Sequence, residues 1–331
     1  MIKKILLVLM FLIVTCGFLF LAVWRGIFLP NSLNEKEVIF DIEKGQGLEE
    51  IALNLERENL IKDDLYFKIY ALFRGTAKDI KAGVYKLNPS LTVPQILEKI
   101  VKGQTFQIEI TIPEGFNLKQ IEEVLSEKLE RTMSLKFSVK EFKDSFDFLS
   151  EIPEEESLEG FLFPDTYLLN PMVNDKEIAE IFLKNFDKKF TRDFKEKIET
   201  QQKNIFEIIT MASLLEKEVK TEEEKEIVSG ILWKRIKINM PLQVDAAIAY
   251  IKNTKTGKVS YEEIKIDSPY NTYKYAGLPK GPICNPGLES IRAALNPKES
   301  DYWYYLSTPD GQTIFSRTLE EHNIAKAKYL I

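Results

Sequence analysis

Glu216 is the residue best placed for chemistry, because it lies near the end of an apolar segment of helical period. In the segment 204–220, N-I-F-E-I-I-T-M-A-S-L-L-E-K-E-V-K, apolar residues recur at spacings of three and four, which predicts a helix. A carboxyl at the edge of an apolar helix loses solvation, and this loss favours its protonated form. A general acid for glycosidic bonds must be protonated near neutral pH. Glu216 is therefore a candidate general acid.

Two structural interpretations compete with acid catalysis. Ser213 and Glu216 have the spacing of a capping box, so Glu216 could instead cap a helix. Lys220 lies four residues after Glu216 and could pair with it on one helix face. That ion pair would favour the carboxylate form, against the catalytic interpretation. These residues alone leave the choice open.

The composition limits the classes of function. The chain has 331 residues, enough for two or three domains, of which 44% are hydrophobic and 29% charged. Its net charge of −6, without a basic patch, argues against nucleic acid as the main partner. The single histidine, His322, excludes a metal site built on a histidine pair. Cys16 lies in an apolar run and Cys284 in a Pro/Gly loop, so no disulfide framework is expected.

The N-terminal segment has the character of a membrane anchor. Residues 5–24 are almost entirely apolar and would rise about 30 Å as a helix, one hydrocarbon thickness. Lys3 and Lys4 precede the run and Arg25 follows it, which favours a cytoplasmic N-terminus and an extracytoplasmic remainder. A cleaved signal peptide is the alternative, but the run is long and lacks a small-x-small cleavage site at its end. We therefore predict a single-pass plasma-membrane protein that contacts the lipid bilayer through residues 5–24, with the stub and anchor at 1–29.

The next segment, 30–104, is predicted to be a linker followed by a small subdomain. Its periodicity and turn residues predict strand 38–43, a helix from Leu48, helix 63–73 capped by Asp63, strand 83–87, and a helix from 92 or 93 to 102. This order, with the piece K-G-Q-G-L-E-E-I-A, resembles a LysM module, a fold that binds N-acetylglucosamine polymers. A plain spacer is the alternative.

The remainder, 105–331, is predicted to be one mixed domain. Expected elements are a strand at 106–112, a helix at about 118–129, a helix at 139–149, and a charged, solvated helix at about 175–199. The acidic run 222–226 is expected to be solvent-exposed charge. The aromatic stretch 161–167 is not explained by a helix or a turn alone.

Four loops rich in Pro, Gly and Asn follow Glu216, at 240–247, 268–273, 277–283 and 285–288. They carry amides, hydroxyls and aromatic rings together. Rings stack on pyranose faces and amides bond to sugar hydroxyls and N-acetyl groups, so this combination is typical of carbohydrate binding. Binding residues are often found on loops that a rigid scaffold positions.

Several motifs in these segments, taken in order, resemble the YceG-like family of endolytic murein transglycosylases, the MltG type. The matching pieces are F-x-F-P-D-T-Y at 161–167, A-S-L-L-E-K-E at 212–218, L-Q-V-D-A at 242–246, S-P-Y-N-T-Y at 268–273, G-L-P-K-G-P-I at 277–283, N-P-G at 285–287, and short pieces at 315–316 and 322–323. With the anchor and the LysM-like part, the resemblance covers nearly the whole chain. It implies an α+β fold for the catalytic part.

The resemblance also implies the activity. Glu216 would be the catalytic acid, and the substrate the β-1,4 bond from N-acetylmuramic acid to N-acetylglucosamine within peptidoglycan glycan strands. Gln243, Asp245, Asn271 and Tyr273 lie on motif positions that we expect to bind substrate. No metal or organic cofactor is implied, and peptidoglycan synthases are candidate partners.

The sequence departs from the family pattern at three places. Val244 replaces an expected hydroxyl residue, Ala246-Ala247 replaces the commoner Pro-Thr or Pro-Ser, and Lys280 replaces a second proline. The first departure puts in doubt a hydrogen bond from position 244, but none removes the acid.

Two alternatives to a lytic transglycosylase stay open. One is a hydrolase with two carboxylates, in which Asp245 would act with Glu216. The other is a membrane-anchored scaffold that binds glycan without cutting it, in which Glu216 would be a cap and the LysM-like part the binding element.

Overall fold

The computed structural model describes residues 2–254 and 259–330, and the chain divides into two compact units. Unit 1 comprises the chain up to Ile108 together with Leu168–Met172, and unit 2 comprises Glu109–Tyr167 together with Val173 onward. The described residues combine helices with three two-stranded sheets, so the predicted α+β class is confirmed.

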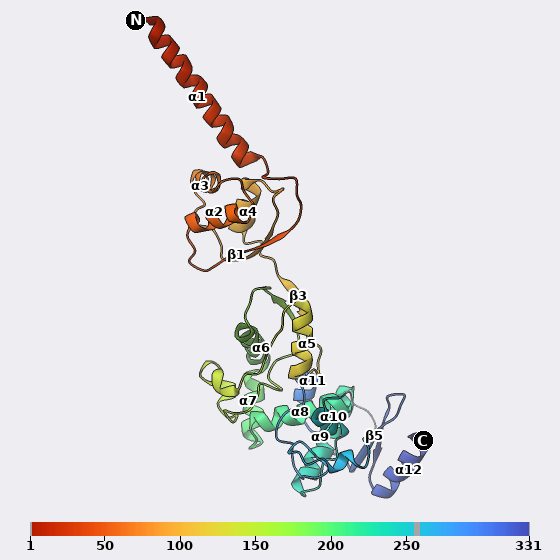
Figure 1. The fold of residues 1–331 in the computed structure, drawn as a ribbon. Coiled ribbons are helices and arrows are strands. Elements are labelled where there is room, and N and C mark those ends of the chain that lie inside the picture. The colour runs from red at the N-terminus through yellow and green to blue at the C-terminus, as the bar shows by residue number, and fades with distance from the viewer. Residues whose placement is uncertain (1, 255–258, 331) are drawn as a thin grey trace. The chain divides into compact units, whose positions relative to one another are not determined.

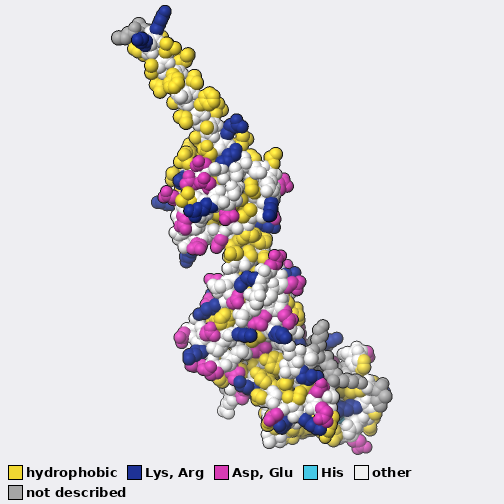
Figure 2. All heavy atoms as spheres, in the orientation of Figure 1, with side chains coloured by type: hydrophobic (Ala, Val, Ile, Leu, Met, Phe, Trp, Pro, Cys, Tyr) yellow, Lys and Arg dark blue, Asp and Glu magenta, His cyan; other side chains and the backbone are white. Residues whose placement is uncertain are grey.

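Helix α1 (Ile2–Phe28) covers the whole apolar run 5–24 that was predicted to contact the bilayer. Among the described residues, Lys3–Phe28 is the one segment whose length and apolar composition would let it cross a bilayer. Apolar side chains cover its surface (yellow in Figure 2), and the most apolar part of the helix is unburied. Its last turn differs, because Ile27 is buried in the core of unit 1 and the ring of Phe28 meets Tyr70 edge-on at 5.9 Å.

The rest of unit 1 has the predicted strand–helix–helix–strand order. Strand β1 (Val38–Ile42) pairs antiparallel with β2 (Gly83–Leu87). The helices of this unit are α2 (Leu48–Arg57), α3 (Asp64–Phe73) and α4 (Val93–Lys102). Asp63 caps α3 by accepting the Leu65 N–H at 2.9 Å, as predicted.

Unit 2 is mainly helical. Its helices are α5 (Leu118–Lys128), α6 (Asp175–Lys189), α7 (Arg192–Thr200), α8 (Ile205–Glu218), α9 (Glu222–Lys237), α10 (Asp245–Lys252), α11 (Leu288–Leu295) and α12 (Leu319–Tyr329). Its short 3-10 turns are η1 (Val139–Glu141), η2 (Lys143–Ser145), η3 (Asp147–Leu149) and η4 (Glu263–Lys265). Strand β3 (Ile108–Thr111) pairs with β4 (Thr166–Leu169), and β5 (Tyr304–Ser307) pairs with β6 (Thr313–Ser316).

Two predicted helices of unit 2 are wrong. The expected helix at 139–149 is the three turns η1 to η3, because Phe142 and Phe146 leave helical geometry at φ −127° and −139° and bury their rings. The expected helix at 175–199 is two helices, α6 and α7, separated at Phe190. The ring of Phe190 stacks on Phe186 at 5.5 Å. Helix α6 also buries one apolar face, so it is not the solvated helix expected.

The aromatic stretch 161–167 belongs to the core of unit 2. Phe161 is fully buried and its ring lies 5.4 Å from that of Phe186. Tyr167 stacks on Phe182 at 4.0 Å and donates its hydroxyl proton to the Phe163 carbonyl. These contacts account for a motif that local secondary structure did not explain.

Helix α8 lies at the centre of unit 2. It packs against α11, α9, α10 and α7 (Figure 1). All six residues from Thr210 to Leu215 are buried, so the helix is enclosed on every side over this stretch. Glu216 therefore emerges from a segment whose position is fixed by packing in all directions.

Candidate active site

The start of α8 lies well before Glu216, which decides between the structural interpretations of that residue. Asn204 is the N-cap, and its side chain forms a capping box with Glu207. Ser213 lies inside the helix, where its Oγ donates to the Thr210 carbonyl and accepts the Ile283 N–H at 3.0 Å. The capping-box interpretation of Ser213 and Glu216 is therefore wrong, and Ser213 instead fixes the 277–283 loop to the helix.

Three groups meet one oxygen of the Glu216 carboxyl. Its Oε2 accepts a hydrogen bond from Ser290 Oγ at 2.6 Å and another from the Gly287 N–H at 3.1 Å. Lys225 Nζ lies 3.6 Å from the same oxygen. The side chain of Glu216 is only 10% exposed. The predicted pairing with Lys220 is wrong, because the cation beside Glu216 comes from α9.

The other carboxyl oxygen of Glu216 is in a different situation. Within residues 2–254 and 259–330, no protein donor forms a hydrogen bond to Oε1. The carboxyl is thus oriented through Oε2, while Oε1 keeps its capacity to exchange a proton with a bound molecule. An acid that must be held in one orientation needs such an asymmetric environment.

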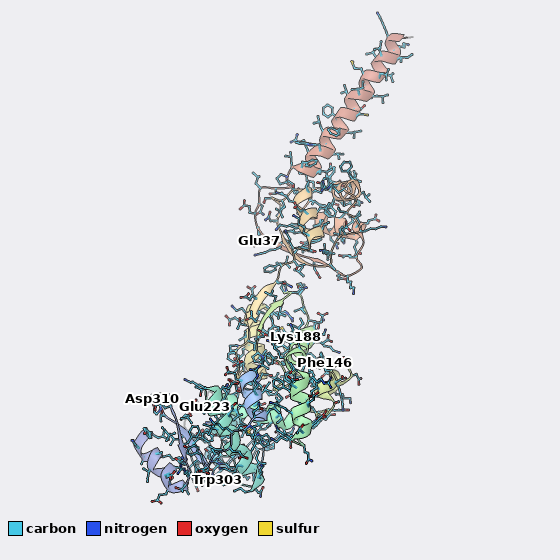
Figure 3. All side chains as sticks on the ribbon, turned by 180° about the vertical axis from the view of Figure 1, so that it is seen from behind. Glu37, Phe146, Lys188, Glu223, Trp303 and Asp310 are labelled. Carbon is cyan, nitrogen blue, oxygen red and sulfur yellow. The ribbon has the colours of Figure 1, made fainter. Side chains whose placement is uncertain are left out.

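Lys225 is a residue that sequence reasoning missed. It lies in the acidic run 222–226, expected to be solvated, yet its side chain is 3% exposed. Its place can be found in Figure 3 from Glu223, which is labelled there and lies two residues before Lys225 in the first turn of α9. A signal was present in the sequence, because Val228, Ser229 and Leu232 follow Lys225 at spacings of three, four and seven and are buried on the same face. This buried face was not predicted because the run 222–226 consists of charged residues and one lysine among four glutamates was expected to be solvated.

Glu114 is a second missed residue, and it lies against the backbone that holds Glu216. The Gly115 N–H donates to the Asn285 carbonyl at 2.9 Å, and the Asn285 N–H donates to the Phe116 carbonyl at 2.8 Å. These two bonds align segment 114–116 with segment 285–287. The Glu114 carboxyl then rests on Gly287 so closely that a Cβ added there would lie 1.9 Å from its Oε1.

Burial raises the pKa of the Glu114 carboxyl, and the charge of Glu216 raises it further. Lys225 acts in the opposite direction, and Glu289, whose side chain is 54% exposed and lies 3.8 Å from Lys225, raises the pKa again. Nothing in the sequence around Glu114 pointed to this position beside Glu216.

Two loops that carry the other predicted site residues are bonded to each other. The Gln243 N–H donates to the Thr272 carbonyl at 3.0 Å, and the Val244 N–H donates to Thr272 Oγ1 at 2.9 Å. The Tyr273 hydroxyl donates to the carboxylate of Asp245 at the start of α10. Gln243 has a positive φ of 55° and an exposed side chain. Gln243, Asp245 and Tyr273 are thus brought together.

Asn271 differs from these three residues because it does not present its side chain to solvent. Its side chain is buried, its Nδ2 donates to the carbonyls of Ile264 and Ile266 at 2.9 and 2.7 Å, and its Oδ1 accepts the Tyr273 N–H at 2.9 Å. Direct contact between Asn271 and substrate stays a prediction. In the structure the Asn271 amide shapes the loop that presents Tyr273.

Asp245 also faces a second carboxyl, Glu218. Burial raises the pKa of Glu218 to about 7, and the charge of Asp245 adds to this effect, while Tyr305 and Arg235 act against it. Arg235 is itself buried and donates to the Leu242 carbonyl at 2.7 Å. Asp245 is therefore part of a network that also holds the loop before α10.

Glu159 is a further buried glutamate, and it bonds to Asn285 in the segment that holds Glu216. Glu159 is buried, and it accepts hydrogen bonds from the Leu118 N–H and from Asn285 Nδ2 at 3.0 Å. Burial raises the pKa of Glu159 to about 8, although its hydrogen-bond donors act against this. A cavity of about 830 Å³ opens beside Glu159 and Tyr250, but Glu216 does not line it.

Comparison with known proteins gives a consistent result. Residues 40–328 match the YceG-like family. An endolytic murein transglycosylase from Bacillus subtilis (strain 168) is 32% identical over 92% of this chain and 89% of its own length. One from Streptococcus pneumoniae serotype 2 (strain D39) is 29% identical over 91% of this chain, which spans 60% of that relative. The crystal structure of a yceG-like protein from Listeria monocytogenes is similar over 88% of this chain and all of its own, with 30% identity and a TM-score of 0.60.

Proposed function

The chain belongs to the YceG-like family, and from this premise we propose that it is a membrane-anchored endolytic murein transglycosylase in which Glu216 is the catalytic acid. The observation that carries the proposal is the Glu216 carboxyl itself. It is fixed through Oε2 by Ser290 and Gly287, it lies beside the buried cation of Lys225, and its Oε1 is left for a substrate. Two relatives are endolytic murein transglycosylases by name, which supports the same activity.

The proposed reaction cleaves the β-1,4 bond between N-acetylmuramic acid and N-acetylglucosamine inside a glycan strand. Glu216 donates its proton through Oε1 to the bridging oxygen while the bond from that oxygen to muramic C1 breaks. The donors on Oε2 stabilise the carboxylate that this transfer creates. Muramic C1 gains oxocarbenium character at the same time.

The second step uses the same carboxyl as a base. Glu216 takes the proton of the C6 hydroxyl of the muramic residue, and O6 forms a bond to C1. The product has a 1,6-anhydro end, Glu216 is protonated again, and no water is consumed. One carboxyl completes the cycle, so the chemistry needs no second acid.

The two bonded loops supply the substrate contacts in this proposal. The exposed amide of Gln243 and the pair formed by Asp245 and Tyr273 present polar groups and an aromatic ring, which suit a sugar with N-acetyl substituents. Asn271 contributes by holding the loop of Tyr273. A two-carboxylate hydrolase that uses Asp245 is the alternative enzyme, and its products distinguish it.

We assign the N-terminal part to localisation and glycan binding. Helix α1 would cross the plasma membrane with its N-terminus in the cytoplasm, so that the rest of the chain meets the nascent wall. The β1–α2–α3–β2 order supports a LysM-like role in binding glycan, with a plain spacer as the alternative. Peptidoglycan synthases that make the strands are candidate partners.

Mass spectrometry of the products tests the proposal. The full chain in detergent is given uncrosslinked peptidoglycan strands, as wild type, as Glu216→Gln, and as Glu223→Gln, which changes an exposed glutamate of α9. Wild type and Glu223→Gln should yield ends one water lighter than hydrolysis products, and Glu216→Gln should lose at least roughly a hundredfold in rate. Reducing ends of full mass would indicate a hydrolase. Binding without any cutting by the wild type would favour the non-catalytic scaffold.

A further inference from the structure

The position of the Glu114 carboxyl is not explained by hydrogen bonds or ion pairs of its own. In the part of the chain that the structure describes, no donor forms a hydrogen bond or an ion pair with it. It lies against Gly287, the residue whose N–H holds Glu216, so closely that a Cβ added there would lie 1.9 Å from its Oε1. A carboxyl placed near a second carboxyl, without a partner of its own, is unfavourable by electrostatics alone.

Local geometry keeps Glu114 in this position. Gly115 adopts a positive φ of 78°, and a Cβ added to it would lie 3.4 Å from Glu216 Cγ. Segment 114–116 therefore passes directly over Glu216. The bare Cα of Gly287 leaves room for the Glu114 carboxyl, since any side chain there would overlap with it. The two glycines together permit Glu114 and Glu216 to approach the same backbone segment.

The charged groups around this pair come from four segments. Lys225 of α9 lies 3.6 Å from Glu216 and also attracts the carboxylate of Glu114, and Glu289 of α11 repels Glu114 from a more exposed position. Lys217 of α8 extends its Nζ over Gly115. Cys284 is also close, but burial raises the pKa of its thiol, so it adds no charge near neutral pH. One buried cation therefore faces two carboxyls at the centre of the cluster.

We propose that Glu114 is a positioning residue for the reaction, which pairs with Glu216 across Gly287 so that the two carboxyls hold one proton for the acid step. This inference rests on the proposed function. Ser290, Gly287 and Lys225 surround Oε2 of Glu216, where they orient the carboxyl and stabilise the carboxylate that forms when Glu216 gives up its proton. The negative charge of Glu114 opposes that loss, because repulsion between two carboxylates is mutual. The pair titrates as a unit.

The dependence of kcat/KM on pH tests this inference in the full chain. Activity should fall on the alkaline side when the pair loses its last proton. In Glu114→Gln that fall should shift by roughly one pH unit to lower pH, which lowers activity near neutral pH by about tenfold. Activity at the acidic end should stay close to that of the wild type. Glu114→Asp, which keeps the charge, should recover most of the profile.

Two further variants separate charge from structure. Gly287→Ala keeps the N–H bond to Glu216 but displaces the Glu114 carboxyl, so it should shift the profile in the same direction as Glu114→Gln. Glu289→Gln removes a more exposed charge and should shift it less. An unchanged alkaline limit in Glu114→Gln, or a rate lowered equally at every pH, would overturn the inference while the wild type still forms 1,6-anhydro ends. A wild type that forms no such ends would overturn the proposed function and this inference with it.

Discussion

The buried carboxyl of Glu159 should make the stability of unit 2 depend on pH in a defined direction. Its pKa is raised by burial from 4.5 to about 8, so the folded state keeps a proton that the unfolded state releases above about pH 4.5. A folded state that binds more protons loses stability as pH rises, and this loss continues until the folded pKa is reached. Between pH 4.5 and pH 8 this effect lowers the free energy of unfolding by about 4–5 kcal/mol in total. About 2 kcal/mol of that loss falls between pH 6 and pH 8.

The substitution Glu159→Gln isolates this contribution. Glutamine keeps the shape and a carbonyl oxygen that can accept the Leu118 N–H, but it does not titrate. Urea unfolding of the full chain in detergent is followed by the fluorescence of its three tryptophans, of which Trp233 and Trp303 lie in unit 2. It gives the free energy of unfolding at each pH. The wild type should lose about 2 kcal/mol more stability between pH 6 and pH 8 than the variant does.

A matched control and a refuting result complete this experiment. Glu223 is exposed and Lys298 holds its pKa below its usual range, so Glu223→Gln should leave the wild-type dependence between pH 6 and pH 8 unchanged. Glu218, whose pKa is about 7, titrates in all three proteins and cancels from the comparison. Equal losses in wild type and Glu159→Gln, within about 0.5 kcal/mol, would show that burial does not keep Glu159 protonated.

Two other substitutions follow from local geometry. Ser290→Ala removes the 2.6 Å bond to Glu216 Oε2, and it should lower kcat about tenfold with little change in KM, as steady-state kinetics on glycan strands would show; a changed KM at constant kcat would contradict this. Gly160→Ala should destabilise unit 2 by about 1–3 kcal/mol more than Gly277→Ala in urea unfolding. Both glycines have φ near +90°, but a Cβ at Gly160 would lie 2.6 Å from Pro282 whereas one at Gly277 meets nothing within 4 Å. Equal effects of these two alanines would refute the steric argument.

The elements that the sequence predicted well are those specified by local interactions. The apolar run of α1 and the Asp63 cap of α3 depend on residues adjacent in the chain, and the structure has both. The helix predictions that were wrong concern segments whose structure depends on contacts between distant residues. The break at Phe190 and the turns around Phe142 and Phe146 arise because aromatic rings are buried against distant parts of the chain, which overrides local helix propensity.

The same distinction applies to the candidate site. Glu216 could be selected from its own segment, because an acidic residue at the end of an apolar helix is visible in the sequence. Its anchor could not, because Gly287 and Ser290 lie 71 and 74 residues further along the chain. Lys225 lies in a run that we expected to be solvated charge, and Glu114 was not singled out at all. Both residues come to lie beside Glu216 only because α8, α9, α11 and segment 114–116 pack together in the folded chain.

The bonds between Asn285 and Phe116, which join residues 169 apart, bear on when the enzyme can first act during its own synthesis. A chain made from its N-terminus presents Glu216 long before Gly287 and Ser290 exist. Until those residues arrive, Oε2 lacks its two hydrogen-bond donors and the segment over Glu216 has no partner to hold it. Nascent chains and truncated fragments that stop short of α11 therefore carry Glu216 without the two groups that donate hydrogen bonds to its carboxyl.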